Sequence, residues 1–451
     1  MRSLLGRFHR PMSRGAMGDM LTMNNLGDGS TLSLDFTAMG GVLDPRLTFT
    51  CASTVATYIN SSGYVATATT NEPRFDYSPT TIGEPRGLLI EGQASTINAW
   101  SEDFTQSYWN KVNTTIASTS VTCPDNIART TVRVTDNNTN NSHSIRRGIA
   151  TTAGSTYTLS WFVKKGSTDT FGVQVYWDGT YNTTLLVSSI DNNTQTVTSA
   201  TNVNATVSRI SYPSSGWFRY VMTFTHPSAT GAATPDFNFA PINSFNAYIG
   251  SSNYTDFFGI QLELGSGASS YIPTGASQVT RNADFLLSAS SSGAGRTSEF
   301  SFDDLAPGTS VLNEYTVLWT YGRDPNSKQE YPASLYARTN SNTERIDLRD
   351  FTGTTVEAGT ETRTVQARNI GTALIAKVAL AQSTSTYPSS AVNGTSATLT
   401  SGAIDSALGL QWVQLGNSSA VSGSFNSIWA RQLKLYPTQL TAAQLQTLTT
   451  P

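Results

Sequence analysis

The side chains that most enzymes use for nucleophilic chemistry are scarce in this chain. Its 451 residues include three histidines, His9, His143 and His226. A catalytic triad needs a histidine close to an activated serine or cysteine, and the sequence contains no Gly-x-Ser-x-Gly motif. It also lacks the short motifs of zinc proteases, P-loop enzymes and dinucleotide-binding enzymes. We therefore expect no catalytic residues and no cofactor.

Paired carboxylates leave one class of enzyme open, because a glycan hydrolase needs only two acids a few ångströms apart. Side chains of consecutive strand residues point to opposite faces, and Arg345 and Arg349 could pair with nearby acids. We therefore expect solvated or ion-paired acids, with a capsule polysaccharide hydrolase as an alternative. The candidate pairs are Glu102 with Asp103, Asp303 with Asp304, and Glu344 with Asp347.

A cluster of aromatic residues around a turn suits the binding of a sugar better than its cleavage. Tyr176, Trp177 and Tyr181 surround Asp178 in the run Tyr-Trp-Asp-Gly-Thr-Tyr. Aromatic faces stack on the CH groups of sugars, and a carboxylate accepts hydrogen bonds from sugar hydroxyls. We predict a glycan site at these four residues. The alternative is a core or subunit interface, because two successive residues of one strand cannot both face outward.

Two loops are rich enough in oxygen ligands to hold calcium. They are Asp136 to Asn140 and Asp191 to Asn193. Calcium takes carboxylate and amide oxygens of this kind, but neither loop has the glycine and later glutamate of an EF-hand. A structural calcium ion therefore remains open, and the metal ligands are unknown.

Charge argues against nucleic acid and membranes as partners. The formal net charge is −3 and the pI is near 5.7, whereas nucleic-acid binders neutralise phosphates with many Lys and Arg residues. No apolar run approaches the ~20 residues of a membrane helix. The first residues are the exception to this acidic balance, and we interpret them as an exposed arm that docks on another protein. The docking residues we predict are Arg2, Arg7, Arg10 and Arg14.

Elements of β-structure must position these groups. Aromatic residues make up 10% of the chain and charged residues 13%, a composition typical of folded β-sandwiches with Ser-, Thr- and Asn-rich surfaces. Runs such as 156–163, 171–177 and 217–224 are rich in aromatic and β-branched residues and are separated by turn clusters. We predict an all-β fold of tandem antiparallel sandwiches, or jelly rolls.

The same pattern suggests where the domains begin and end. We expect an irregular N-terminal arm, then a hairpin and extended connector, a first sandwich, a Ser/Gly-rich linker and a second sandwich. At the C-terminus, Thr441 with Gln444 forms a capping box, and Leu440 opposite Leu445 forms a hydrophobic staple, which predicts a short helix. The expected boundaries are 1–45, 46–96, 97–284, 285–297 and 298–451.

Several phrases of the sequence resemble a module of tailed-phage virion structural proteins. These phrases span about 45–285 in the expected order, and the stretch between them resembles a carbohydrate-binding jelly roll. Residues 428–446 resemble the end of a concanavalin-A or laminin-G-like domain of the same proteins. Cys51 departs from the pattern, since an arginine is more usual there. The phrases are Thr48–Thr54, Asn71–Tyr77, Gly87–Gln93, Trp100–Phe104 with Trp109, Gln261–Gly265, Ser270–Thr274 and Val279–Asp284.

This resemblance implies a tail fibre, head fibre or spike that attaches by its N-terminal region and adheres to host-surface glycan. The implied partners are other virion proteins and further copies of the chain, most often in a trimer. A capsid decoration or cement protein is an alternative. Assembly would take place in the reducing cytoplasm of the host bacterium before the chain resides in the virion. For that reason we expect Cys51 and Cys123 to be free, although a bridge between them stays open.

Overall fold

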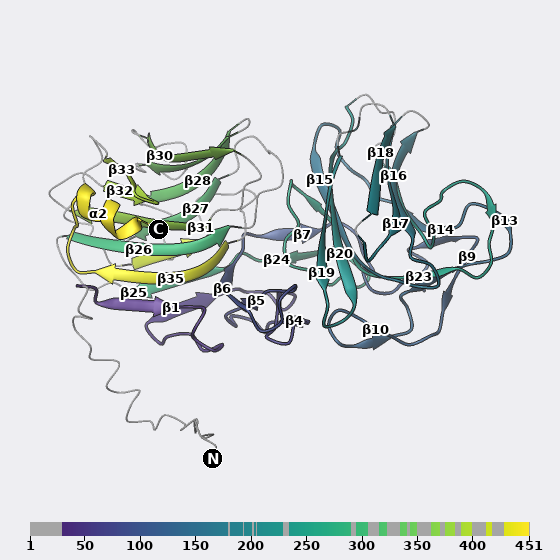
Figure 1. Ribbon diagram of the computed structural model, residues 1–451, viewed down its shortest axis with the longest axis horizontal. Coiled ribbons are helices and arrows are strands. Elements are labelled where there is room, and N and C mark those ends of the chain that lie inside the picture. Colours follow the sequence, from purple (N-terminus) through teal and green to yellow (C-terminus); the bar gives the residue numbers. More distant parts are fainter. Residues whose placement is uncertain are drawn as a thin grey trace, which may run out of the picture.

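A computed structural model shows an almost entirely β protein made of two sandwiches side by side (Figure 1). The all-β prediction with one short C-terminal helix is confirmed. The structure describes residues 29–178, 181–192, 194–200, 203, 205–228, 234–289, 295–304, 315–322, 334–340, 343–349, 362–369, 375–383, 389–398, 412–416 and 428–450.

The first sandwich consists of two six-stranded antiparallel sheets that face each other. One sheet has the strand order β19 (Ala205–Tyr212), β20 (Trp217–Thr225), β15 (Thr156–Lys164), β23 (Tyr254–Leu264), β12 (Arg133–Asp136) and β9 (Thr114–Ala117). The other has the order β18 (Thr194–Ala200), β17 (Tyr181–Ser189), β16 (Phe171–Asp178), β21 (Asp236–Ala240), β14 (Ser144–Gly148) and β8 (Asn110–Val112). We call them the β15 sheet and the β16 sheet.

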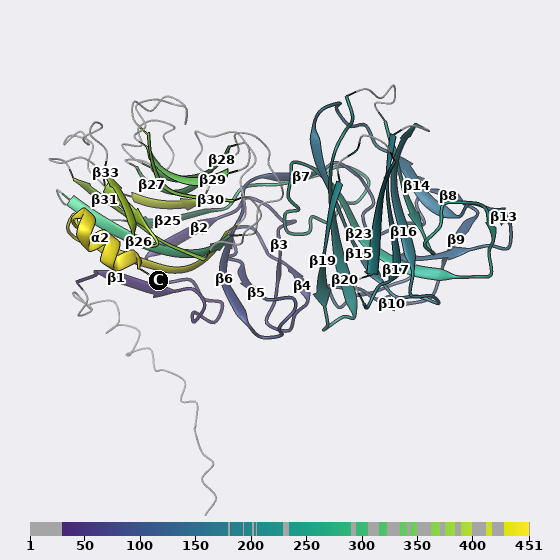
Figure 2. The same ribbon diagram turned by 45° about the horizontal axis from the view of Figure 1, so that its top comes forward.

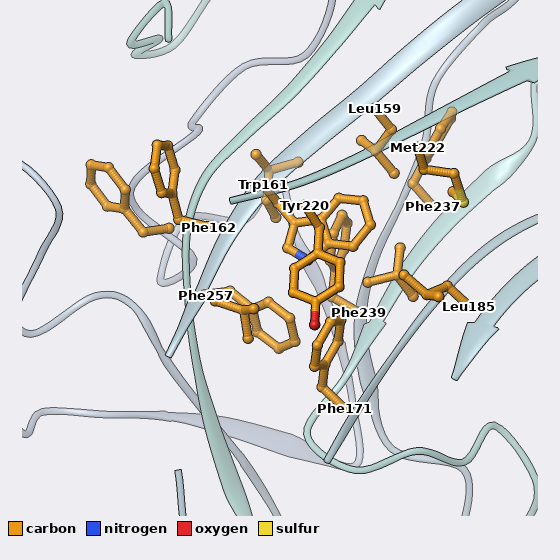
Figure 3. Close-up of a cluster of buried hydrophobic side chains, with 14 of the residues drawn as sticks. Leu159, Trp161, Phe162, Phe171, Leu185, Tyr220, Met222, Phe237, Phe239 and Phe257 are labelled. Carbon is orange, nitrogen blue, oxygen red and sulfur yellow. The ribbon is translucent and has the colours of Figure 1, made fainter. Parts of the chain in front are cut away.

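Alternating aromatic residues fill the space between these two sheets. Trp161 stacks on Tyr220 with ring centroids 5.7 Å apart, and Phe171 meets Tyr220 edge to face at 5.1 Å. Figure 3 shows this cluster, with Phe162 apart from it beside the β15 ribbon. Buried aromatic side chains bring large apolar areas out of water, so these rings hold the two sheets together.

The second sandwich also consists of two sheets, and both contain strands from opposite ends of the chain. One has the order β33 (Thr395–Thr398), β32 (Ser389–Val392), β31 (Ile375–Ser383), β26 (Gly295–Asp304), β35 (Ile428–Tyr436), β6 (Pro85–Ile90) and β5 (Phe75–Tyr77), with β1 (Leu32–Asp35) also paired to β35. The other has the order β2 (Leu47–Thr50), β25 (Phe285–Ala289), β34 (Trp412–Gly416), β27 (Tyr315–Gly322), β28 (Ser334–Asn340), β29 (Thr343–Arg349) and β30 (Thr362–Asn369).

The expected domain boundaries therefore differ from the observed strand pairing. Within the expected arm 1–45, strand β1 pairs with β35, and Leu34 and Phe36 are buried in the core of the second sandwich. Within the expected linker 285–297, strand β25 pairs on both sides with β2 and β34. The first sandwich is thus inserted into the second, because strands that flank it in sequence share the same sheets.

Four short two-stranded ladders complete the described fold. The expected hairpin consists of β3 (Thr57–Ile59) and β4 (Val65–Thr67). Where the chain enters and leaves the first sandwich, β7 (Ala94–Thr96) pairs with β24 (Val279–Arg281) and forms a two-stranded neck. The remaining ladders pair β10 (Val121–Thr122) with β11 (Ala128–Arg129) and β13 (Asn140–Asn141) with β22 (Tyr248–Ile249).

The C-terminal helix α2 (Ala442–Thr449) begins as its sequence predicts. Thr441 accepts a hydrogen bond from the Gln444 backbone N–H, and the Gln444 side chain accepts one from the Thr441 N–H, so the capping box is confirmed. Leu445 is fully buried, with Leu440 and Leu448 packed around it against alanines of β31 and β32. Among the described residues, no helix combines the length and apolar character needed to cross a membrane.

Candidate functional site

The predicted aromatic cluster lies at one end of β16, and the strand separates its members. The residues Phe171, Val173 and Val175 point into the core, so Trp177 points inward with them. Its ring packs on Phe224 and His226, and only 5% of it is exposed. The prediction that Trp177 contacts a ligand is therefore wrong, because its ring is enclosed by the core.

Tyr176 faces the other way and is 38% exposed on the outer face of the β16 sheet. Tyr181 begins β17, pairs with Asp178 and packs partly against the core. The side chain of Asp178 lies outside the described residues. Of the four predicted residues, the structure therefore leaves Tyr176 as the exposed aromatic surface.

A row of polar side chains lies beside Tyr176 on this outer face. Gln174, two residues before Tyr176 on β16, is opposite Thr184 on one neighbouring strand and Asn238 on the other. Asn238 in turn is opposite Arg146. Gln174 donates to the Thr184 hydroxyl at 3.0 Å. Thr184 and Asn238 are nearly buried, so the more exposed polar groups of the row are Gln174 and Arg146. We call Arg146, Asn238, Gln174 and Thr184 the polar row.

The row that contains Tyr176 is also polar. Tyr176 is opposite Asn182 on β17 and Asp236 on β21. The Asp236 carboxylate lies 3.8 Å from the Arg146 guanidinium, and both side chains are about two-fifths exposed. These opposite charges partly balance each other, so the described side chains around Tyr176 combine its ring with several hydrogen-bonding groups and little net charge. Sequence reasoning missed these neighbours because they come from four strands.

The centre of the outer face of the β15 sheet is covered by the chain itself. Thr158, Ser160 and Gln261 point outward there, yet none is exposed. The segment 265–274 lies on them: Thr158 donates to the Gly265 carbonyl at 2.9 Å, and Gln261 accepts from the Ile272 N–H at 2.7 Å. The exposed side chains of this outer face, such as Thr206 and Ser208, lie on the edge strand β19. The outer face of the β16 sheet, by contrast, carries the exposed Tyr176 on a central strand.

The two sandwiches meet at a cluster of buried charges near the neck. Arg74 is fully buried, donates to Glu91 at 2.5 Å and forms an ion pair with Asp284. Ser270 donates through its N–H and hydroxyl to Glu91, and the Arg281 guanidinium lies 3.6 Å from the same carboxylate. These five residues come from four of the phrases on which the phage resemblance rests, so those phrases build the junction. We call them the junction cluster.

Electrostatics keep Glu91 and Arg74 of the junction cluster ionised. Burial alone would raise the pKa of Glu91, but Arg281, Arg74 and the bonds from Ser270 together hold it well below its usual range. Burial would lower the pKa of Arg74, and the carboxylates of Asp284 and Glu91 raise it instead. Both groups are therefore charged at neutral pH although neither contacts solvent. Since each buried charge needs its partners, the cluster is stable only while all of its members are present.

Asp76 links the junction to the second sandwich. One carboxylate oxygen accepts from the Ile59 N–H and the other from the Trp429 indole at 2.7 Å. The Arg86 guanidinium lies 3.6 Å above the Trp429 ring. Burial raises the pKa of Asp76 to about 6, although the bonds from Ile59 and Trp429 oppose the rise.

Of the carboxylates considered for hydrolysis, those whose side chains the structure describes already have hydrogen-bond or ion-pair partners. Glu102 accepts from the Tyr271 hydroxyl and pairs with Arg129, and Asp103 accepts from Thr105 and Gln106. Burial raises the pKa of Glu102 despite Arg129. The side chains of Asp303, Asp304, Glu344 and Asp347 lie outside the described residues.

The two loops considered for calcium differ in how their carboxylates are engaged. Asp136 accepts four hydrogen bonds, from Tyr248, Ser251 and twice from Asn253. Asp191 lies exposed beside Lys165, 3.5 Å away. In the part of the chain that the structure describes, no three His, Cys, Asp or Glu side chains gather as a metal site would require.

The remaining predictions concern the two cysteines, expected to be free, and the N-terminal arginines, expected to dock on another protein. Cys51 and Cys123 are both free and buried, in different sandwich cores. Burial raises the pKa of each thiol to about 12, so neither is a reactive thiolate. The proposed docking residues Arg2, Arg7, Arg10 and Arg14 lie outside the described residues.

Comparisons with known proteins give only loose structural likeness. No protein-family model and no curated protein matches the chain. Among solved structures, the binding domain of botulinum neurotoxin serotype G aligns with 61% of the chain and 50% of its own length, at 9% identity and a TM-score of 0.24.

Two other solved structures are matched at similar levels. Trypanosoma rangeli sialidase aligns with 93% of the chain and 96% of its own length, at 10% identity and a TM-score of 0.25. Domains LG4-5 of the mouse laminin alpha1 chain align with 68% of the chain and 88% of their own length, at 12% identity and a TM-score of 0.19. The chain spans 50 to 60% of the structures matched first. At such TM-scores the likeness does not indicate what the chain binds.

Proposed function

We propose that this chain is a non-enzymatic glycan-binding protein, and that it serves as a fibre or spike on a tailed-phage particle. The observation that supports glycan binding is that Tyr176 lies beside the polar row on the outer face of the β16 sheet. Sugar rings are bound by an aromatic platform together with amides and hydroxyls that take the ring hydroxyls. The part about the particle rests on the resemblance of the sequence phrases.

The position of this face supports a role in presenting a binding surface. The β15 sheet lies on the side of the first sandwich toward the second, and the β16 sheet lies farther away (Figures 1 and 2). Both β1 and helix α2 belong to the second sandwich. A particle protein that attached through the second sandwich would hold the face of the β16 sheet away from the attachment point.

The test is to probe the purified full chain on an array of bacterial surface polysaccharides. We expect specific binding that Tyr176→Ala lowers about tenfold or more, because the ring stacking and its buried area would both be lost. Leu264→Ala is the matched control, since Leu264 is a large exposed apolar side chain on β23 in the other sheet. Unchanged binding after Tyr176→Ala, or release of sugars by the protein, would contradict the proposal.

A further inference from the structure

The far end of the same strand carries a second aromatic ring. Gly172 lies on β16 four residues before Tyr176, and both point to the outer face because Phe171, Val173 and Val175 point inward. A Cβ placed on Gly172 would lie 2.9 Å from Cε2 and 3.2 Å from Cζ of Phe245. The tip of the half-buried Phe245 ring therefore lies directly over the outer side of Gly172.

The two rings frame the polar row. Strand residues rise ~3.4 Å each, so positions 172 and 176 are about 14 Å apart along β16. Gln174 lies halfway between them, with Asn238 beside it on β21 and Thr184 on β17. A single sugar ring is too short to touch both aromatic residues, whereas a chain of several rings could reach both while its hydroxyls meet the polar row.

We infer that the ligand of this face is an uncharged oligosaccharide that lies along β16 from Tyr176 to Phe245, and that Phe245 selects for chain length. This inference rests on the proposed function and specifies its ligand. The absence of a side chain at Gly172 is what lets Phe245 reach the sheet. The balance between Arg146 and Asp236 favours a neutral ligand over an anionic one.

The polar row at the centre of this face favours a sugar as its ligand over a second copy of the chain. Interfaces between copies are enriched in apolar residues at their centre, whereas the centre of this face holds Gln174, Asn238 and Thr184. Asn238 and Thr184 are only 7% and 9% exposed. Both already take part in hydrogen bonds within the sheet, Thr184 with Gln174 and Asn238 with the Asp236 carbonyl. Direct contact with the hydroxyls of a sugar therefore falls mainly to Gln174 and Arg146.

The test is calorimetric titration of the full chain with cello-, malto- and chito-oligosaccharides, each from the monosaccharide upward, together with the tightest polysaccharide of the array cut to graded lengths. We expect affinity to rise with length and then level off once the ligand spans both rings. Phe245→Ala should remove the gain for long ligands, about tenfold, and leave the affinity for short ones unchanged. Phe245→Tyr keeps the ring and should keep the gain.

Each other outcome counts against the inference alone or against both proposals. If the unaltered chain binds sugars through Tyr176 but affinity is independent of length, or Phe245→Ala weakens short and long ligands alike, the inference is overturned and the proposed function survives. If the chain binds none of these sugars, both fail. If Tyr176→Ala instead dissociates an oligomer in a sizing column, the face belongs to a second copy and both fail.

Discussion

Arg74 shows how single residues hold the junction together. It has no exposed surface, and its charge is balanced by Glu91 and Asp284, which are also buried. A buried ion pair adds little net stability, but removal of one partner leaves the other charge buried and unpaired. The contribution of Arg74 therefore depends on its two acidic partners remaining in place.

Arg74→Ala should be strongly destabilising. We expect a loss of about 3–5 kcal/mol in the free energy of unfolding, because Glu91 and Asp284 would remain buried without their partner. Urea denaturation followed by tryptophan fluorescence measures this. Arg46→Ala is the control, since Arg46 pairs with Asp44 in a partly exposed ion pair, and it should cost about 1 kcal/mol or less. Equal effects of the two substitutions would contradict the buried junction.

Asp76 should make stability depend on pH in the opposite sense from most carboxylates. Its pKa rises from an ordinary 3.8 to about 6 in the folded chain, so between these values the folded state binds more protons than the unfolded state. Stability then falls as pH rises through this window, by about 3 kcal/mol at most. Denaturation curves between about pH 4 and pH 7 should show this loss in the unaltered chain relative to Asp76→Asn. If the difference in unfolding free energy between the unaltered chain and Asp76→Asn stays constant over this pH range, the raised pKa of Asp76 is refuted.

The sequence located one end of the candidate site and could not assemble the rest. Composition marked the run from Tyr176 to Tyr181, and alternation showed that Tyr176 and Trp177 point apart, but not which one is exposed. The polar row could not be foreseen because Arg146 and Asn238 are distant in sequence and meet only through strand pairing. Phe245 lies in a loop with no periodic pattern, so only its place over Gly172 reveals it.

At the scale of elements, the strands of the sheets were predictable but their partners were not. Runs of aromatic and β-branched residues predicted β15, β16 and β20, and the capping box predicted α2. β1 pairs with β35 from the other end of the chain, and just before β1 the Thr31 hydroxyl donates to the Leu435 carbonyl, 404 positions away. Hydrophobic alternation says that Leu32 and Leu34 are buried, but it carries no information on the strand beside them.

The contact between β6 and β35 depends on one glycine. Gly87 has a φ of 120°, and a Cβ there would overlap the carbonyl oxygen of Ala430. Gly87→Ala should therefore cost about 2 kcal/mol or more, since both the backbone conformation and the strand contact oppose a side chain. Gly275→Ala is the control, because nothing lies within 4 Å of its Cβ position. If the midpoint of thermal unfolding falls equally in both variants, the close approach of Gly87 to the Ala430 carbonyl is unimportant for stability.

At the scale of the whole molecule, the insertion of one sandwich into the other sets what can fold alone. The first sandwich has its own core and is connected through the neck of β7 and β24. The second needs β1, β2, β5 and β6, which precede the first sandwich, as well as strands that follow it. Its core includes Leu34, Phe49 and Leu88 beside Phe300 and Leu433.

Expression of the parts tests this arrangement. Residues 93–283 alone should fold cooperatively, because they contain both sheets of the first sandwich and the neck. Residues 285–451 alone should fail to fold, because the strands from 30–90 would be missing from both sheets. Circular dichroism and thermal melts distinguish the outcomes. A stable, cooperative fold of residues 285–451 would show that the two sandwiches are arranged in tandem instead.

The central claim, that the outer face of the β16 sheet binds sugar, is tested most directly by amide hydrogen exchange of the full chain with and without the tightest-binding array glycan. We predict slower exchange in β14, β16, β17, β21 and the loop around Phe245, with β15, β20, β23 and the second sandwich unchanged. Protection confined to other strands, or no change on saturation with the glycan, would contradict the claim.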